Sequence, residues 1–208
     1  VNKNPLAVEE LLELCANAAL DGVSVVAVVI ATGEVVAASF NKIQVAASES
    51  SERPFFEIFA EERCKQSSSK ALVQYMCDVD ERCNLFQNLE VMFLATLREH
   101  RNRKLGLALC GISVDIAKKI KEGPVSEVTV QDLGPTYSSM KKGLPVNTYP
   151  KICQAIWTGK ATQSIGKALN FTPHLSVSFQ EFVYKGKTFA DRIGPNEPFC
   201  EVVARPLY

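Results

Sequence analysis

The stretch from Leu89 to Ile120 constrains the fold of this chain more than any other, because a strand, a basic loop and a helix follow one another directly. Residues 89–97 are largely apolar and do not alternate, which is typical of a strand covered on both faces. After the loop, apolar residues recur at intervals of four and three, the pattern of a helix with one buried face. These residues are Leu105, Leu109, Ile112, Ile116 and Ile120. This order predicts a mixed α/β fold built around the strand.

The loop between this strand and this helix has the composition of an anion-binding site. Residues 98–104, REHRNRK, carry four positive side chains and one carboxylate. Backbone N–H groups at a helix start are unpaired within the helix and the helix dipole favours negative charge, so a phosphate or diphosphate is stabilised there. Gly106 and Ala108 leave room for such a ligand against the main chain, while Arg101, Arg103 and Lys104 add charge. The alternative is an exposed basic turn in which Gly106 only packs.

The composition restricts the partners that the chain takes. Lys plus Arg and Asp plus Glu number 23 each, so there is no global positive field for nucleic acid or an anionic membrane. The longest apolar run, residues 23–31, is far shorter than the roughly 20 residues of a membrane span, and no signal peptide is visible. Seven cysteines without a C-x-x-C pair and only two histidines favour reduced thiols over a zinc site. We expect a cytoplasmic protein, a monomer by default, with no metal.

The first half of the chain shows further helix and strand signals. Two β-rich runs joined by a turn predict a hairpin at residues 22–40. Apolar residues flanking a polar centre predict one or two amphipathic helices at residues 55–77. Residues 123–150 are rich in proline and glycine, which predicts a long surface excursion with little regular structure.

The second half of the chain ends in an antiparallel set. A strand is predicted at residues 152–157, followed by a short helix with Ala161, Ile165 and Leu169 facing inward and Asn170 as its left-handed end. Alternation around residues 175–179, a turn at 185–186 and a final run at 201–207 predict strands paired antiparallel. We find no internal repeat and no linker, which favours one domain over two.

Three stretches of the sequence resemble a known family. Arg103-x-x-Gly106-x-Ala108 fits the [QR]-x-x-G-x-[GA] acyl-coenzyme A loop of the GNAT acetyltransferase superfamily. Residues 156–171, IWTGKATQSIGKALNF, resemble the strand-and-helix signature of insect arylalkylamine N-acetyltransferase-like proteins, and residues 181–195, EFVYKGKTFADRIGP, resemble their tail. The resemblance implies a single GNAT domain over residues 1–208, with a central mixed, mostly antiparallel sheet flanked by helices.

The resemblance also implies a co-substrate and a mechanism. Acetyl-coenzyme A would lie in a split between two central strands, and a neutral amine would attack the thioester directly in a ternary complex, without an acyl-enzyme. The end of the strand would bond the pantetheine arm and polarise the thioester carbonyl, and the loop would hold the diphosphate. The cofactor-binding residues implied are Thr96, Leu97, Arg98, Arg103, Lys104, Leu105, Gly106, Leu107 and Ala108. Lys104 replaces the usual second glycine of the loop.

The catalytic positions of the family are only partly kept. Asn4-Pro5-Leu6 resembles the family's Glu-Pro-Leu, whose glutamate is the presumed base, and the family's first strand and helix start are not found before it. Thr158 and Thr162 stand at two serine positions, so the hydroxyls are kept. Asn4 cannot accept a proton, because an amide has no accessible basic form.

Three interpretations of Asn4 stay open. Another residue among Glu57, Glu61, Asp78 and His174 takes over as the base, the substrate is a less basic amine, or turnover is poor. His174 is the histidine placed to line an acceptor pocket, whereas His100 is expected to be solvated.

Several residues also have ordinary structural interpretations. Thr158 is a good helix N-cap, and Thr162 lies one turn later, so both could serve only the helix. Asp78 and Asp80 are expected to be surface charges at a chain reversal, and Trp157 is expected in the core.

The leading hypothesis is an N-acetyltransferase that moves acetyl from acetyl-coenzyme A to a small arylalkylamine. One alternative is an acyl-coenzyme A binding protein with impaired catalysis, motivated by Asn4. Another is an acyltransferase for a different acceptor, such as a polyamine or agmatine.

Overall fold

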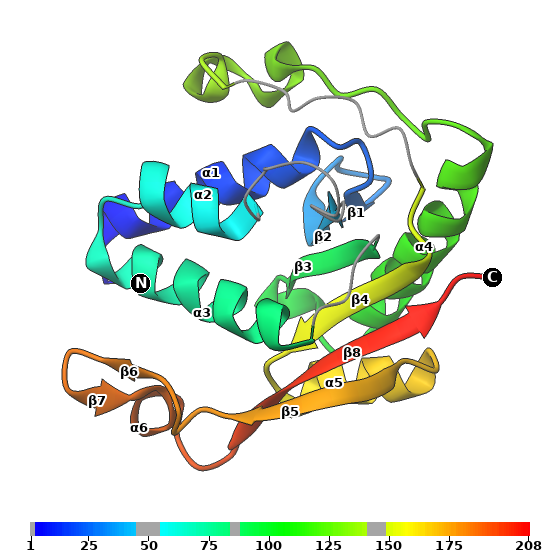
Figure 1. Ribbon diagram of the computed structural model, residues 1–208. Helices are drawn as coiled ribbons and strands as arrows, with labels where there is room; N and C mark the ends of the chain where they lie inside the picture. Colours follow the sequence, from blue (N-terminus) through cyan, green and yellow to red (C-terminus); the bar gives the residue numbers. More distant parts are fainter. Residues whose placement is uncertain (1–2, 45–54, 84–87, 141–148) are drawn as a thin grey trace.

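The computed structural model describes residues 3–44, 55–83, 88–140 and 149–208 (Figure 1). A six-stranded sheet with the order β1-β2-β3-β4-β8-β5 forms its centre. Its strands are β1 (Val25–Val28), β2 (Val35–Gln44), β3 (Asn88–Thr96), β4 (Ile152–Trp157), β5 (Thr172–Ser178) and β8 (Phe199–Pro206). All neighbouring strands pair antiparallel except β3 and β4, which are parallel. A separate two-stranded sheet pairs β6 (Val183–Tyr184) with β7 (Lys187–Thr188). The mixed, mostly antiparallel sheet confirms the predicted fold class.

Helices cover both faces of the sheet (Figure 1). One face carries α1 (Pro5–Ala19), α2 (Phe55–Glu62) and α3 (Ser67–Cys83), and the other carries α4 (Leu105–Lys119) and α5 (Lys160–Ala168). The short α6 (Phe189–Ile193) follows the small sheet. Each face has its own buried apolar cluster, so the sheet is the middle layer of three. None of the helices in the described ranges has the length and apolar character that crossing a bilayer requires.

The central parallel pair is short. Only four residue pairs join β3 to β4, from Asn88–Ile152 to Val91–Ala155, although β3 continues to Thr96 and β4 to Trp157. On its other side β3 pairs with β2 to its end, but Met92 has no partner there, since Phe40 pairs with Phe93 and Asn41 with Val91. This extra residue is a β-bulge, which bends a strand. The bulge therefore lies at the residue where β3 leaves β4.

The bulge also explains why this strand does not alternate in the sequence. Leu89 and Val91 pack in the cluster under α4, but Met92 and Phe93 both pack in the cluster under α3. Beyond the bulge, Leu94 returns to the α4 side. The covered, non-alternating central strand that the sequence predicted is confirmed.

Helix α4 is confirmed, but its predicted buried face is partly wrong. Ile112, expected inside, is 45% exposed. The residues that are buried are Leu109, Cys110, Ser113, Val114 and Ala117. Small side chains let this face approach the sheet closely, so a pattern based on the largest apolar residues gives the wrong rotation of the helix.

The remaining predicted elements are confirmed with small shifts, except that Ala161, expected to face inward from the short helix, is exposed. The hairpin is formed by β1 and β2, and residues 55–77 form two helices. Asn170 ends α5 with a φ of 57°, and Lys185 and Gly186 turn the small hairpin with positive φ angles of 48° and 69°. Trp157 is in the core, 3% exposed. The predicted excursion contains only short 3-10 turns in its described part, and residues 141–148 lie outside the described residues.

The contact between α5 and β4 gives a stability test. A Cβ atom added at Gly166 would lie 2.5 Å from Nε1 of Trp157, whereas one added at Gly111 in α4 would meet nothing closer than 3.9 Å. We expect Gly166→Ala to lower the free energy of unfolding by about 1–3 kcal/mol through overpacking. Gly111→Ala is the matched control and should leave it unchanged or raise it by up to about 1 kcal/mol. Urea unfolding measures both, and equal effects would contradict this packing.

Candidate functional site

Two cavities adjoin where β3 and β4 separate. The larger, about 670 Å³, lies between the end of β3, the basic loop, the start of α4 and one side of α5. The smaller, about 220 Å³, lies between α3, the ends of β3 and β4, and the start of α5. Leu94 lines both cavities. The two cavities therefore lie on either side of one residue of β3.

The larger cavity contains the predicted anion cradle. The first backbone hydrogen bond of α4 runs from the Ala108 N–H to the Lys104 carbonyl at 3.0 Å. Leu105, Gly106 and Leu107 all line the cavity. Their N–H groups have no acceptor within the helix. A phosphate in this cavity would meet three N–H donors at the positive end of a helix dipole.

Some of the predicted cofactor-binding residues line the larger cavity and others do not. Lining the larger cavity are Thr96, Lys104, Leu105, Gly106 and Leu107. Not lining it are Leu97, Arg98, Arg103 and Ala108. The positive side chain that replaces Arg103 in the lining is Arg101, whose Nε lies 3.5 Å from the Thr96 carbonyl.

Two loop residues that line the cavity are not among the predicted cofactor-binding residues. His100 and Asn102 line the cavity, and His100 is half-buried rather than freely solvated. The motif could not locate them, because the side of the loop that faces the helix depends on backbone turns that the sequence does not reveal.

Gly106 serves both purposes that its sequence context suggested. A Cβ atom at this position would lie 3.1 Å from Cδ1 of Ile165 and 3.4 Å from Cδ2 of Leu94. The glycine therefore lets α4 pack closely against α5 and β3, and it also lines the larger cavity.

The smaller cavity is mostly apolar with a few polar groups. Its apolar lining residues are Leu72, Tyr75, Met76, Val91, Met92, Phe93, Leu94, Ile156 and Trp157. The polar residues in the same lining are Thr158, Thr162 and Glu90. Apolar walls with a few convergent polar groups are typical of a small-molecule site.

Thr158 is not the N-cap of α5, contrary to its structural interpretation. Gly159 is the N-cap, and a carboxylate oxygen of Glu197 accepts a hydrogen bond from the Lys160 N–H at 2.9 Å. The hydroxyl of Thr162 donates to the Gly159 carbonyl at 2.8 Å. The Thr158 side chain is exposed and carries no cap, so its hydroxyl is free to face a ligand in the cavity.

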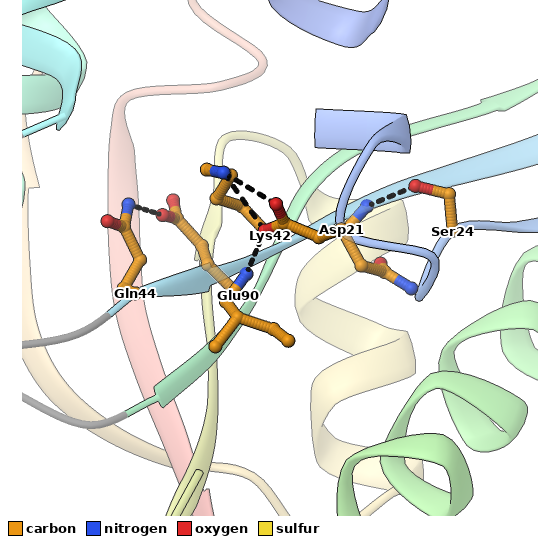
Figure 2. Close-up of polar contacts among 7 residues, drawn as sticks. Asp21, Ser24, Lys42, Gln44 and Glu90 are labelled. Atoms are coloured by element: carbon orange, nitrogen blue, oxygen red, sulfur yellow. Dashed lines mark hydrogen bonds and ion pairs between the residues drawn. The ribbon is translucent and has the colours of Figure 1, made fainter. Parts of the chain in front are cut away.

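Glu90 is the group that the sequence did not single out. It lies in the middle of β3, is 1% exposed, and accepts a hydrogen bond from the Gln44 amide at 2.8 Å (Figure 2). Burial and the nearby carboxylate of Asp80 raise the pKa of Glu90 from 4.5 to about 8. The signal for it was a single carboxylate within an apolar run. Burying a carboxylate costs free energy, and such groups are found mostly at functional sites.

Asp80 is not a surface charge, contrary to the expectation. It is partly buried on α3 and accepts a hydrogen bond from the Gln154 side chain. Burial raises the pKa of Asp80, and the hydrogen bond from Gln154 opposes the shift. The C-terminal part of α3 lies over the sheet at this point, which a pattern of charges along a helix could not show.

The other candidate bases lie away from the cavities. Asn4 precedes α1 and donates a hydrogen bond to Gln66 at 2.9 Å. It lines neither cavity, and the same holds for Glu57, Glu61, Asp78 and His174.

Comparison with known proteins shows the fold. No protein-family model matches the sequence, and no curated protein matches it. Arylalkylamine N-acetyltransferase 2 from Aedes aegypti is 12% identical over 90% of this chain and 74% of its own, with a TM-score of 0.62. Putative arylalkylamine N-acetyltransferase 7 from the same mosquito is 14% identical over 99% and 73%, with a TM-score of 0.62. A polyamine N-acetyltransferase of Drosophila melanogaster that forms N-acetylagmatine is 15% identical over 89% and 75%, with a TM-score of 0.54. The chain has the GNAT acetyltransferase fold.

Lys104 provides a test of the loop geometry. As the N-cap of α4 it has a left-handed backbone with a φ of 59°, which costs a residue with a Cβ atom about 1–2 kcal/mol. We expect Lys104→Gly to raise the free energy of unfolding by roughly 0.5–1 kcal/mol, since part of the gain is offset by the greater freedom of glycine in the unfolded chain. Asn102, with a φ of 62°, is the control, because asparagine tolerates this conformation and Asn102→Gly should gain less. A larger gain for Asn102→Gly than for Lys104→Gly in urea unfolding would contradict the left-handed strain at Lys104.

The raised pKa of Glu90 predicts a pH dependence of stability. The folded state binds this proton more tightly than the unfolded state, so the contribution is complete below about pH 4.5 and is lost as pH rises towards 8. Relative to the parent, Glu90→Gln should gain stability with rising pH by up to about 1.4 kcal/mol per pH unit over this window. Urea unfolding at several pH values measures the difference, with Glu34→Gln in an exposed turn as the control. Parallel curves for the parent and Glu90→Gln would show that this carboxyl titrates normally.

Proposed function

We propose that this chain is an N-acetyltransferase that moves acetyl from acetyl-coenzyme A to a small amine, and that residues 1–208 act as one domain. The observation that carries the proposal is that two cavities share the lining residue Leu94, just beyond the point where β3 and β4 separate. Solved structures of the same fold include N-acetyltransferases for arylalkylamines and for agmatine. The larger cavity would hold the co-substrate and the smaller one the amine.

The larger cavity suits the diphosphate and the pantetheine arm of coenzyme A. The N–H groups of Leu105 to Leu107 would bind the diphosphate, with the ammonium of Lys104 and the guanidinium of Arg101 neutralising its charge. Beyond Val91, β3 has no pairing partner on its β4 side. Its free main-chain groups there would bond the extended arm as a neighbouring strand does, and would polarise the thioester carbonyl.

The smaller cavity favours an amine with one apolar substituent. Its volume is below the range of about 300–1,000 Å³ that is usual for ligand pockets, so it suits a small acceptor. Among its described lining residues Glu90 is the one charged group, whereas a polyamine or agmatine carries a second cation that would need a second acidic partner. The aromatic and aliphatic walls therefore support an arylalkylamine over those acceptors.

The lining residues support direct attack by the amine. No cysteine occurs among the described residues of either lining, so these cavities offer no thiol for an acyl-enzyme. The hydroxyls of Thr158 and Thr162 lie at the acceptor end, where they would orient the amine or hydrogen-bond the leaving thiolate. The reaction would then be a single transfer within a ternary complex.

The function is tested by following free thiol release from acetyl-coenzyme A. We expect release to depend on an arylalkylamine such as tyramine, dopamine or serotonin, and to be slower with agmatine and spermidine because of their second charge. Tight binding of the co-substrate without release, for every amine tried, would contradict the proposal.

The second candidate is an acyl-coenzyme A binding protein with impaired catalysis, which Asn4 favours because an amide stands at the family's glutamate position. Asn4→Glu separates the two candidates. Amine-dependent release that appears only in this variant supports the binding protein, and release by the parent excludes it.

A further inference from the structure

Glu90 stands in a polar row that crosses the three central strands. Lys42 on β2 pairs in register with Glu90 on β3, and Glu90 with Gln154 on β4. Residues in register on neighbouring strands share a face of the sheet, so all three lie on the face that α3 covers. Glu90 is the member of this row that lines the smaller cavity, together with Thr158 and Thr162.

The cation of this row does not neutralise Glu90. The ammonium of Lys42 bonds both carboxylate oxygens of Asp21, at 2.8 and 2.9 Å (Figure 2). It also lies 4.8 Å from the centre of the Phe55 ring. Within the described ranges, no ion pair reaches Glu90, and the Gln44 amide bonds its Oε2 atom. A carboxylate without a cation in an apolar cavity keeps its affinity for a proton.

We propose that Glu90 accepts the proton that the amine loses before it attacks acetyl-coenzyme A, and that Asp80 is a positioning residue that keeps Glu90 able to hold this proton. This inference rests on the proposed function. It gives the chain a carboxylate residue in the lining of the acceptor cavity, whereas Asn4 lines neither cavity.

The proton balance of the transfer is complete with these groups. The substrate enters as an ammonium, and one proton passes through water in the cavity to the carboxylate of Glu90. The free amine then forms the N–C bond, the C–S bond breaks, and the second proton of the attacking nitrogen goes to the leaving thiolate. One amide, one thiol and one proton result, and Glu90 returns the proton to solvent before the next turnover.

Asp80 is the charged group that raises the pKa of Glu90. On α3, Asp80 is partly buried and faces the row through Gln154, and its own neighbour Glu81 is exposed. On β2 the only charge in the row is Lys42, which Asp21 neutralises, and β4 contributes the uncharged Gln154. The like charge of Asp80 raises the pKa of Glu90, which brings it nearer to neutral pH and to the range that suits proton transfer.

The first test compares Glu90→Gln with Asp78→Asn in the thiol-release reaction. Asp78 is a matched control because it lies two residues before Asp80 on α3, accepts a hydrogen bond from Gln74, and lines neither cavity. We expect Glu90→Gln to lower kcat by about 100-fold or more without a change in coenzyme A affinity, and Asp78→Asn to keep the parent kcat. Release by Glu90→Gln within about threefold of the parent would overturn the proposal.

The second test measures the acid limb of kcat/KM against pH. We expect Asp80→Asn to move this limb towards lower pH by about one unit, because the like charge that raises the pKa of Glu90 is gone. A residue that only supports the fold would change the melting temperature and leave the limb in place, so an unmoved limb overturns the role of Asp80. This variant keeps Glu90 and remains informative if Glu90→Gln does not fold.

The two proposals fail in different ways. Activity of the parent together with activity of Glu90→Gln removes Glu90 as the proton acceptor and leaves the acetyltransferase function standing. Absence of activity in the parent with every amine removes the function, and the inference that rests on it.

Discussion

The site of this protein depends on the early end of the pairing between its two central strands. Parallel strands in a sheet normally bond along their whole length, and here β3 and β4 share only the pairs up to Val91–Ala155. The bulge at Met92 bends β3 at this point and turns Leu94 to the side of α4. The divergence leaves one edge of β3 unpaired and lets cavities form on both sides of Leu94. A straight strand would close this opening.

The second constraint is a buried carboxyl group, Glu90, that pairs with no cation among the described residues. Removing a carboxylate from water is expensive, and here one amide hydrogen bond from Gln44 compensates it only in part. The ammonium of Lys42, whose residue pairs in register with Glu90, is bonded to Asp21, and the carboxylate of Asp80 adds repulsion. Such an arrangement lowers the stability of the fold at neutral pH, and in proteins it is found most often where a proton must be held and released.

The sequence predicted the elements of the fold well because their signals are local. A run without alternation identified β3, the turn residues identified both hairpins, and a positive φ was expected correctly at Asn170. The predicted buried face of α4 was partly wrong. Small residues such as Ser113 and Ala117 are buried, while the larger Ile112 is exposed. Size and hydrophobicity alone do not tell which side of a helix packs most closely.

What the sequence determined by itself is most of the order of strands and helices from β1 onward, the basic loop, and the start of α4 at its end, since these follow from periodicity, turn chemistry and charge over a few residues. Helices α1 and α6 were not predicted. The tertiary structure alone decided which loop residues line a cavity, that Asn4 bonds Gln66 away from it, and that Glu90 lies within it. The physical reason is that these outcomes depend on register and on a single bulge. Both bring together residues far apart in the chain, such as Gln44, Asp80 and Glu90, which no local pattern connects.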